Sequence, residues 1–220
     1  MKAIILAAGR GERMRPLTDI TPKPLLEVKG KPLIVWHIER LAKAGFEEII
    51  INIAHLGYKI IEALGDGTKW GVRIIYSDEQ DEGALESAGG IVKALALLGN
   101  KPFLVVNADI WTDFNFDTSV DLGDDLVHLV LVQNPEHNLD GDFGLNRDRA
   151  LSEADEKYTF SGVGYYRPQA FKEINYGKRA LAPILRDLMR QNLVSGELFR
   201  GVWTDVGTVK RLEDINKSIF

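Results

Sequence analysis

Cysteine is absent from the 220 residues of this chain. Disulfide bonds and thiolate zinc sites are therefore excluded, and any metal ion must be held by oxygen or imidazole ligands. Long apolar runs are also absent. The first run, Ala3 to Ala8, is far shorter than the roughly 20 residues of a membrane-spanning helix and too short for a signal peptide. We therefore expect a cytoplasmic protein that does not enter a membrane.

An overall excess of basic residues is missing as well, because the formal net charge is -5. Binding to nucleic acid would need a basic face, so nucleic acid is excluded as the main partner. The sign of the charge reverses locally between residues 10 and 32, where six basic side chains outnumber three acidic ones. A local excess of positive charge on an acidic protein suits a small anionic ligand.

Apolar runs alternate with helical patterns along the chain, which predicts an α/β fold of Rossmann-like type, with a mixed, mainly parallel sheet flanked by helices. We expect one domain over residues 1–220. The predicted strands are Lys2 to Ala7, Glu48 to Ala54, Val72 to Ser77, Phe103 to Asn107, Leu126 to Gln133, Tyr158 to Tyr166 and Gly196 to Trp203. The predicted helices are Pro32 to Ala44, Tyr58 to Leu64, Ser87 to Leu98, Ala182 to Gln191 and Val209 to Ile219.

The segment LAAGRGERMRPLT, which begins at Leu6, follows the first strand with a loop of two glycines and three arginines. It lacks the third glycine of a dinucleotide fingerprint, where Met14 stands, and the Gly-Lys-Ser/Thr of a Walker loop. Two interpretations stay open. Gly9 and Gly11 let backbone N–H groups approach phosphate oxygens beside cationic Arg13 and Arg15, or the segment is an ordinary surface turn.

Lys23 favours the first interpretation, because it stands between Pro22 and Pro24. A residue before proline is biased towards extended backbone, and proline itself is rigid. Lys23 is therefore expected to sit on a stiff arm beside a phosphate-type loop.

Four motifs resemble the sugar-1-phosphate nucleotidyltransferases: LAAGRGERMRPLT, PKPLLEV, VVNADIW and WTDVGT. The resemblance covers nearly the whole chain and implies the nucleotide-diphospho-sugar transferase fold. Further stretches, LESAGGIVKAL, GDFGL, TFSGVGYY and LAPILRDL, are similar to members of the family that act on N-acetylmuramate α-1-phosphate in peptidoglycan recycling. The resemblance thus implies UTP and a sugar 1-phosphate as partners, with Mg²⁺ as cofactor.

The same resemblance implies a role for individual residues. Lys23 would contact the α-phosphate and Arg13 the leaving pyrophosphate, as the catalytic pair. Asp109 and Asp205 would hold Mg²⁺. The residues implied to line the nucleotide are Leu6, Ala8, Gly9, Gly11, Glu12, Arg13 and Lys23, and those implied to contact the sugar phosphate are Asn107, Gly141, Asp142, Glu153 and Ser161.

Base recognition follows from the chemistry of uracil, whose N3–H donor lies between two carbonyl acceptors. A carboxylate such as Glu79 would accept the N3 proton, and backbone N–H groups of the Glu86–Ser87 turn would donate to a carbonyl. None of the four histidines is needed as a general base, because a sugar phosphate is largely dianionic at pH 7. Among the histidines, His55, which follows a strand, is the one candidate to line the pocket, although a structural role is the favoured interpretation for it as for the others.

Three alternatives remain. A glycosyltransferase using a UDP-sugar would carry an Asp-x-Asp pair, which Asp109-Ile110-Trp111 lacks. An inactive sugar-nucleotide sensor is disfavoured because Arg13, Lys23, Asp109 and Asp205 are all present. Glucose, mannose and N-acetylglucosamine 1-phosphates are rival acceptors, although the chain shows no appended domain of the kind that bifunctional N-acetylglucosamine 1-phosphate enzymes carry.

Overall fold

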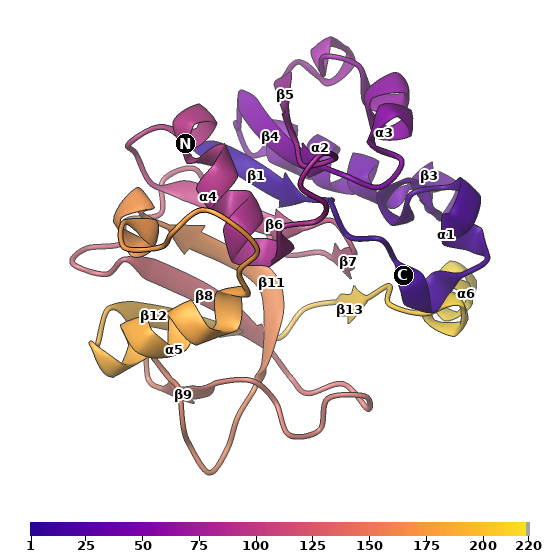
Figure 1. Cartoon of the computed structure of the whole chain (residues 1–220). Coiled ribbons are helices and arrows are strands. Elements are labelled where there is room, and N and C mark those ends of the chain that lie inside the picture. The colour runs from indigo at the N-terminus through magenta and orange to yellow at the C-terminus, as the bar shows by residue number, and fades with distance from the viewer. Residues whose placement is uncertain (219–220) are drawn as a thin grey trace.

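The computed structural model describes residues 1–218 and contains one large mixed sheet, two small sheets and helices packed on both faces of the large one (Figure 1). The order of the nine strands in the large sheet is β5-β4-β1-β6-β11-β8-β12-β10-β9. Their bounds are β1 Lys2–Leu6, β4 Glu48–Ile53, β5 Arg73–Asp78, β6 Phe103–Asn107, β8 Val127–Val132, β9 Gly144–Asn146, β10 Arg149–Leu151, β11 Thr159–Tyr166 and β12 Val194–Phe199.

Four of the eight neighbouring strand pairs in this sheet are parallel, and they hold more of the paired residues than the four antiparallel pairs, which include β12–β10 and β10–β9. Strands β5, β4, β1 and β6 are parallel to one another, β11 runs antiparallel to both β6 and β8, and β12 returns parallel to β8. The carboxyl ends of β1, β4 and β6 therefore lie at one edge, where ligands bind in open α/β sheets. The prediction of a mixed, mainly parallel sheet flanked by helices is confirmed.

The helices are α1 Leu17–Ile20, α2 Leu33–Lys43, α3 Gly57–Leu64, α4 Glu86–Leu98, α5 Leu181–Arg190 and α6 Val209–Lys217. Successive β1 residues face opposite cores: Ile5 packs in the core that holds Ile38 of α2, and Ile4 in the core that holds Ile91 of α4. Helices α2 and α3 thus cover one face of the sheet, and α4 and α5 cover the other. No described helix is long and apolar enough to cross a membrane.

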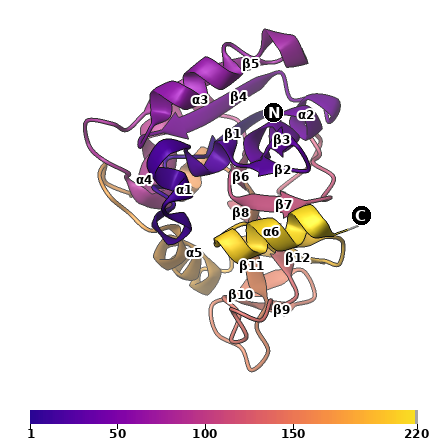
Figure 2. The same cartoon turned by 90° about the vertical axis from the view of Figure 1, so that its right-hand side faces the viewer.

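A third, smaller core lies under α6 (Figure 2). It contains Ile215 of α6, Met14 from the arginine-rich loop and Val28 of the hairpin formed by β2 Glu27–Val28 and β3 Lys31–Pro32. The last two strands, β7 Ile110–Thr112 and β13 Trp203–Asp205, pair antiparallel beside it. Helix α6 consequently anchors the segment that follows β13 against the N-terminal loop.

The predicted elements are recovered with small shifts at their ends, apart from one strand. The expected strand from Gly196 to Trp203 is wrong, because β12 ends at Phe199 and Trp203 opens the separate strand β13. Asp113 causes the break: its carboxylate accepts from the Val202 N–H at 2.6 Å, and its own N–H donates to the Val202 carbonyl. The predicted end of the last helix, Ile219, lies outside the described residues.

Candidate active site

A cleft of about 540 Å³ opens at the carboxyl edge of the parallel strands. One wall is the loop after β1, and the other is formed by the start of α4 and the end of β6. Eleven of the predicted site residues line it: Leu6, Ala8, Gly9, Gly11, Glu12, Arg13, Lys23, Glu86, Ser87, Asn107 and Asp109. The structure therefore gathers the glycine loop, the lysine arm and one predicted metal ligand around a single cavity.

The glycine loop is fixed at both ends. Where β1 ends, the Ala7 N–H donates to the Asn52 side-chain oxygen at 2.6 Å. Gly11 has φ of 65°, and a Cβ there would come within 2.8 Å of Thr18 Cγ2, so the position requires glycine. The Thr18 hydroxyl donates to the Gly11 carbonyl at 2.9 Å, which closes the turn. The loop is thus shaped before any ligand arrives.

Lys23 extends across the cleft to Asp109. Its side chain is buried, and its Nζ lies 2.6 Å from Asp109 Oδ2. Pro22 has extended backbone, with ψ of 140°, but Lys23 itself begins a short 3₁₀ helix, Lys23–Leu25, so the extended backbone expected at Lys23 is wrong. An ion pair at this degree of burial holds a cation where the cleft meets the end of β6.

Asp205 is brought beside Asp109 by the pairing of β13 with β7. Asp205 is the partner of Ile110 in that ladder, and the Val206 N–H donates to the Asp109 carbonyl at 2.7 Å. We expected the two aspartates to lie close together because each follows a predicted strand of one parallel sheet. For Asp205 that reason is wrong, because a separate antiparallel pair delivers it.

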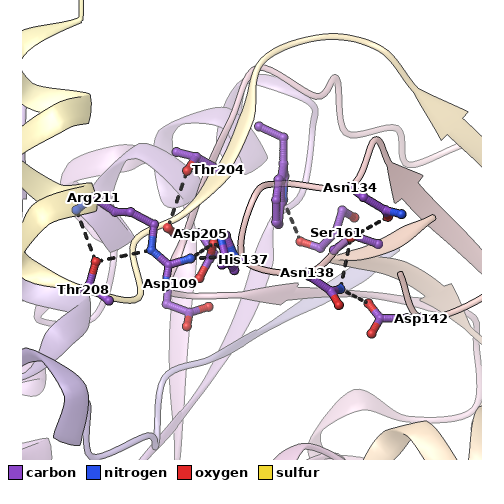
Figure 3. A network of polar contacts seen from close by, with 12 residues as sticks. Asp109, Asn134, His137, Asn138, Asp142, Ser161, Thr204, Asp205, Thr208 and Arg211 are labelled. Atoms are coloured by element: carbon purple, nitrogen blue, oxygen red, sulfur yellow. Dashed lines mark hydrogen bonds and ion pairs between the residues drawn. The ribbon is translucent and has the colours of Figure 1, made fainter. Parts of the chain in front are cut away.

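Arg211 and His137 both contact the Asp205 carboxylate (Figure 3). Its Oδ1 lies 2.5 Å from Arg211 Nη1 and 2.9 Å from His137 Nε2. Arg13 is also close, because a Cβ on Gly207 would meet both Arg13 Nη2 and Asp205 Oδ2. In this structure each predicted metal ligand is therefore neutralised by a basic side chain, Asp109 by Lys23 and Asp205 by Arg211.

The two aspartates suit a Mg²⁺ ion, which takes one or two carboxylates and completes its shell with phosphate oxygens and water. Among residues 1–218, no three His, Asp or Glu side chains gather closely enough to form a full protein cage for a metal. A donor set this sparse fits an ion that enters together with a phosphate ligand.

Glu79 does not lie where the base-reading hypothesis requires. It is 0% exposed, and its two oxygens accept from Asn52 Nδ2 at 2.7 Å and from the Leu85 N–H at 2.8 Å. Burial raises the pKa of the Glu79 carboxyl, and these two hydrogen bonds oppose that shift. Glu79 therefore holds the segment that precedes Glu86 and Ser87 and does not face the cleft.

A second cavity of about 440 Å³ adjoins the cleft and shares Glu86, Ser87 and Asn107 with it. Of the five residues predicted to contact the sugar phosphate, Asn107 and Asp142 line this cavity. The Asp142 carboxylate accepts from the Phe160 N–H at 2.8 Å, which ties the loop before β9 to β11. The cavity thus extends the cleft towards α5.

The other three predicted acceptor residues line neither cavity. Gly141 packs its backbone against Lys157, where a Cβ would meet the main chain at 2.7 Å. Glu153 is exposed and pairs with Lys157 at 3.0 Å. Ser161 is buried at the bulge of β11, where its hydroxyl donates to the Val130 carbonyl at 2.6 Å. These three residues therefore lie outside the two cavities.

Some residues at the site were not singled out from the sequence. Arg211 lies three residues after Thr208, the N-cap of α6, and that spacing places both on one side of the first turn. His137 comes from the long loop between β8 and β9, where no pattern indicated its contact. His55, the one histidine considered for the pocket, does not line the cleft, and its Nε2 lies 3.1 Å from the Thr18 carbonyl.

The family model and the similar proteins all point to nucleotidyl transferases. The family model for nucleotidyl transferases matches residues 2–220. An N-acetylmuramate alpha-1-phosphate uridylyltransferase of Neisseria meningitidis is 57% identical, with 97% of this chain and 96% of the relative covered. An enzyme of the same description from Caulobacter vibrioides is 34% identical, with 93% and 91% covered.

A solved structure from Bacillus anthracis, assigned as a glucose-1-phosphate thymidylyltransferase, shares the fold. It superposes with a TM-score of 0.86 at 24% identity, with 98% of this chain and 94% of that chain covered.

Proposed function

This chain belongs to the nucleotidyl transferase family, and from that premise we propose that it transfers a uridylyl group from UTP to N-acetylmuramate α-1-phosphate. The products are UDP-N-acetylmuramate and pyrophosphate. The geometric observation that carries the proposal is the Lys23–Asp109 pair, 2.6 Å apart, in a cleft walled by the glycine loop. The relative at 57% identity supports the choice of acceptor.

The acceptor phosphate supplies the nucleophile in this reaction. One of its oxygens forms a bond to the α-phosphorus of UTP, and the bond from that phosphorus to the oxygen bridging the β-phosphorus breaks. The electron pair leaves with pyrophosphate. No proton has to be removed, because the acceptor phosphate is largely dianionic at pH 7. Catalysis then consists of positioning and charge neutralisation.

The chain divides these tasks among the residues of the cleft. Lys23 moves from Asp109 onto the α-phosphoryl oxygens, and Arg13 neutralises the pyrophosphate. Asp109 and Asp205 would hold Mg²⁺, which would supply charge neutralisation for the phosphates. Backbone groups at the start of α4 and just before it, where Ala84, Glu86 and Ser87 line the cleft, face the base in place of Glu79.

The location and pathway belong to the same proposal. UTP is a cytoplasmic metabolite, so we place the enzyme in the cytoplasm, with peptidoglycan recycling as the process that provides the sugar phosphate. Residues 1–220 serve as a single nucleotidyltransferase domain.

A substrate panel tests the proposed function. Purified protein with Mg²⁺ receives each of the four nucleoside triphosphates with N-acetylmuramate, N-acetylglucosamine, glucose or mannose 1-phosphate, and pyrophosphate release is measured. The proposal predicts the highest kcat/KM with UTP and N-acetylmuramate 1-phosphate. A higher value with another acceptor would assign the enzyme to that sugar.

A further inference from the structure

The second cavity has a single cationic lining residue among those described, Arg186 of α5. The cavity reaches the cleft through Glu86, Ser87 and Asn107, so a sugar whose phosphate lies near Lys23 extends into it. Phe143, Phe160, Leu181 and Leu185 make much of the remaining wall apolar. A cation in such surroundings interacts more strongly with an anion than it would in open solvent.

The Arg186 side chain is held over an aromatic ring. Its guanidinium carbon lies 5.3 Å from the centre of the Phe143 ring, and Phe143 is buried. A cation–π contact orients the guanidinium and leaves its N–H donors available. Within residues 1–218, Arg186 makes no ion pair, whereas Arg190, one turn further along α5, pairs with Asp187.

The carboxylates near this guanidinium already have partners. Asp142 accepts from the Phe160 N–H, and Glu86 lies 3.6 Å from Lys178 Nζ. Glu153, whose pKa the Arg186 charge helps to lower, pairs first with Lys157. The charge of Arg186 is therefore available to an anionic group of a ligand in the second cavity.

We propose that Arg186 selects the acceptor by binding the carboxylate of its lactyl group. This inference rests on the proposed function. N-acetylmuramate carries a 3-O-lactyl ether that N-acetylglucosamine lacks, and the lactyl group ends in a carboxylate. A guanidinium matches a carboxylate with two parallel N–H donors, a geometry that lysine does not reproduce.

The test compares two acceptors in matched variants. The kcat/KM for N-acetylmuramate 1-phosphate is divided by that for N-acetylglucosamine 1-phosphate, from pyrophosphate release with saturating UTP. We expect Arg186→Gln to lower this ratio roughly 10- to 100-fold, as for loss of one charge-assisted hydrogen-bonded pair, mainly through the KM for the lactyl acceptor. Arg186→Lys restores part of the ratio, and Arg190→Gln keeps that of the wild type.

A modified acceptor separates recognition from a structural effect. If the lactyl carboxylate is converted to its amide, the kcat/KM of the wild type for the lactyl acceptor falls by the same factor. The same change of acceptor lowers the kcat/KM of Arg186→Gln little further. An unchanged ratio in Arg186→Gln, or equal losses with both acceptors, overturns the inference while the proposed function stands. A wild-type enzyme without preference for the lactyl acceptor contradicts the proposed function itself.

Discussion

Replacing Glu79 with glutamine removes one of two buried acceptors that face two donors. Asn52 Nδ2 and the Leu85 N–H both point at this carboxylate, and a glutamine offers one oxygen and one NH₂ group. The glutamine NH₂ group then faces one of these two donors, which is left without an acceptor, and the side chain at this position is 0% exposed. An unsatisfied buried donor costs about 1–3 kcal/mol.

Loss of the carboxylate charge offsets part of that cost, because burial disfavours the ionised form and raises the pKa of Glu79. We expect a net destabilisation of about 1–2 kcal/mol at pH 7, hence a Tm lower by roughly 2–8 °C for a chain of this size. Because Leu85 precedes Glu86 and Ser87 in the cleft wall, the KM for UTP should rise about tenfold, equivalent to about 1.4 kcal/mol.

The assay measures Tm by thermal denaturation and KM for UTP and CTP by pyrophosphate release. Asp81→Asn, an exposed change in the same loop, is the matched control and should behave as the wild type. If Glu79 holds the turn, the preference for UTP over CTP persists in Glu79→Gln. Unchanged stability together with a loss of that preference would refute the structural role and restore Glu79 as the residue that reads the base.

Three further predictions concern the cleft and the core. Lys23→Met keeps the fold and lowers kcat by about 10² to 10³, the scale of one preorganised electrostatic contact, and near-normal kcat in the folded variant would remove Lys23 from the mechanism. Asp109→Asn and Asp205→Asn each lower kcat roughly 10²-fold or more. If both hold one Mg²⁺, as proposed, the double variant is scarcely worse than either single variant, and additive losses would show that the two aspartates do not share a metal ion. Burial lowers the pKa of His37 to about 4, so the unfolded chain binds a proton that the folded one does not, and stability falls as pH drops from about 6.5 towards 4. That loss is about 2 kcal/mol between pH 7 and pH 5, and His37→Leu should abolish it in urea titrations; an unchanged pH dependence contradicts this assignment.

The sequence predicted the sheet because its central strands are apolar runs of the right length between clear turn signals. The motif residues near the end of β6 and in the glycine loop were also placed well, since they lie close to regular elements. Asp109 and Lys23, for example, are 86 residues apart in the chain, yet the fold brings them to 2.6 Å.

The residues that were misplaced depend on contacts distant in the sequence. The buried Glu79 carboxylate accepts a hydrogen bond from Asn52, 27 residues earlier, and no pattern within the loop of Glu79 indicates this contact. The break between β12 and β13 depends on Asp113, 89 residues before Val202. Gly201 permits the bend, because a Cβ there would lie 2.2 Å from the Phe199 ring. Local periodicity alone reads such a segment as one continuous strand.

The fate of each phosphate of UTP tests the central claim most directly. Purified protein is given Mg²⁺, N-acetylmuramate 1-phosphate and UTP labelled at either the α- or the γ-phosphate, and the products are separated. Uridylyl transfer predicts that the α-label appears in UDP-N-acetylmuramate and the γ-label in pyrophosphate, in equal amounts, and that Asp109→Asn slows both together. Label retained in UTP despite tight binding, or transfer of the γ-phosphate to the sugar, would contradict the account.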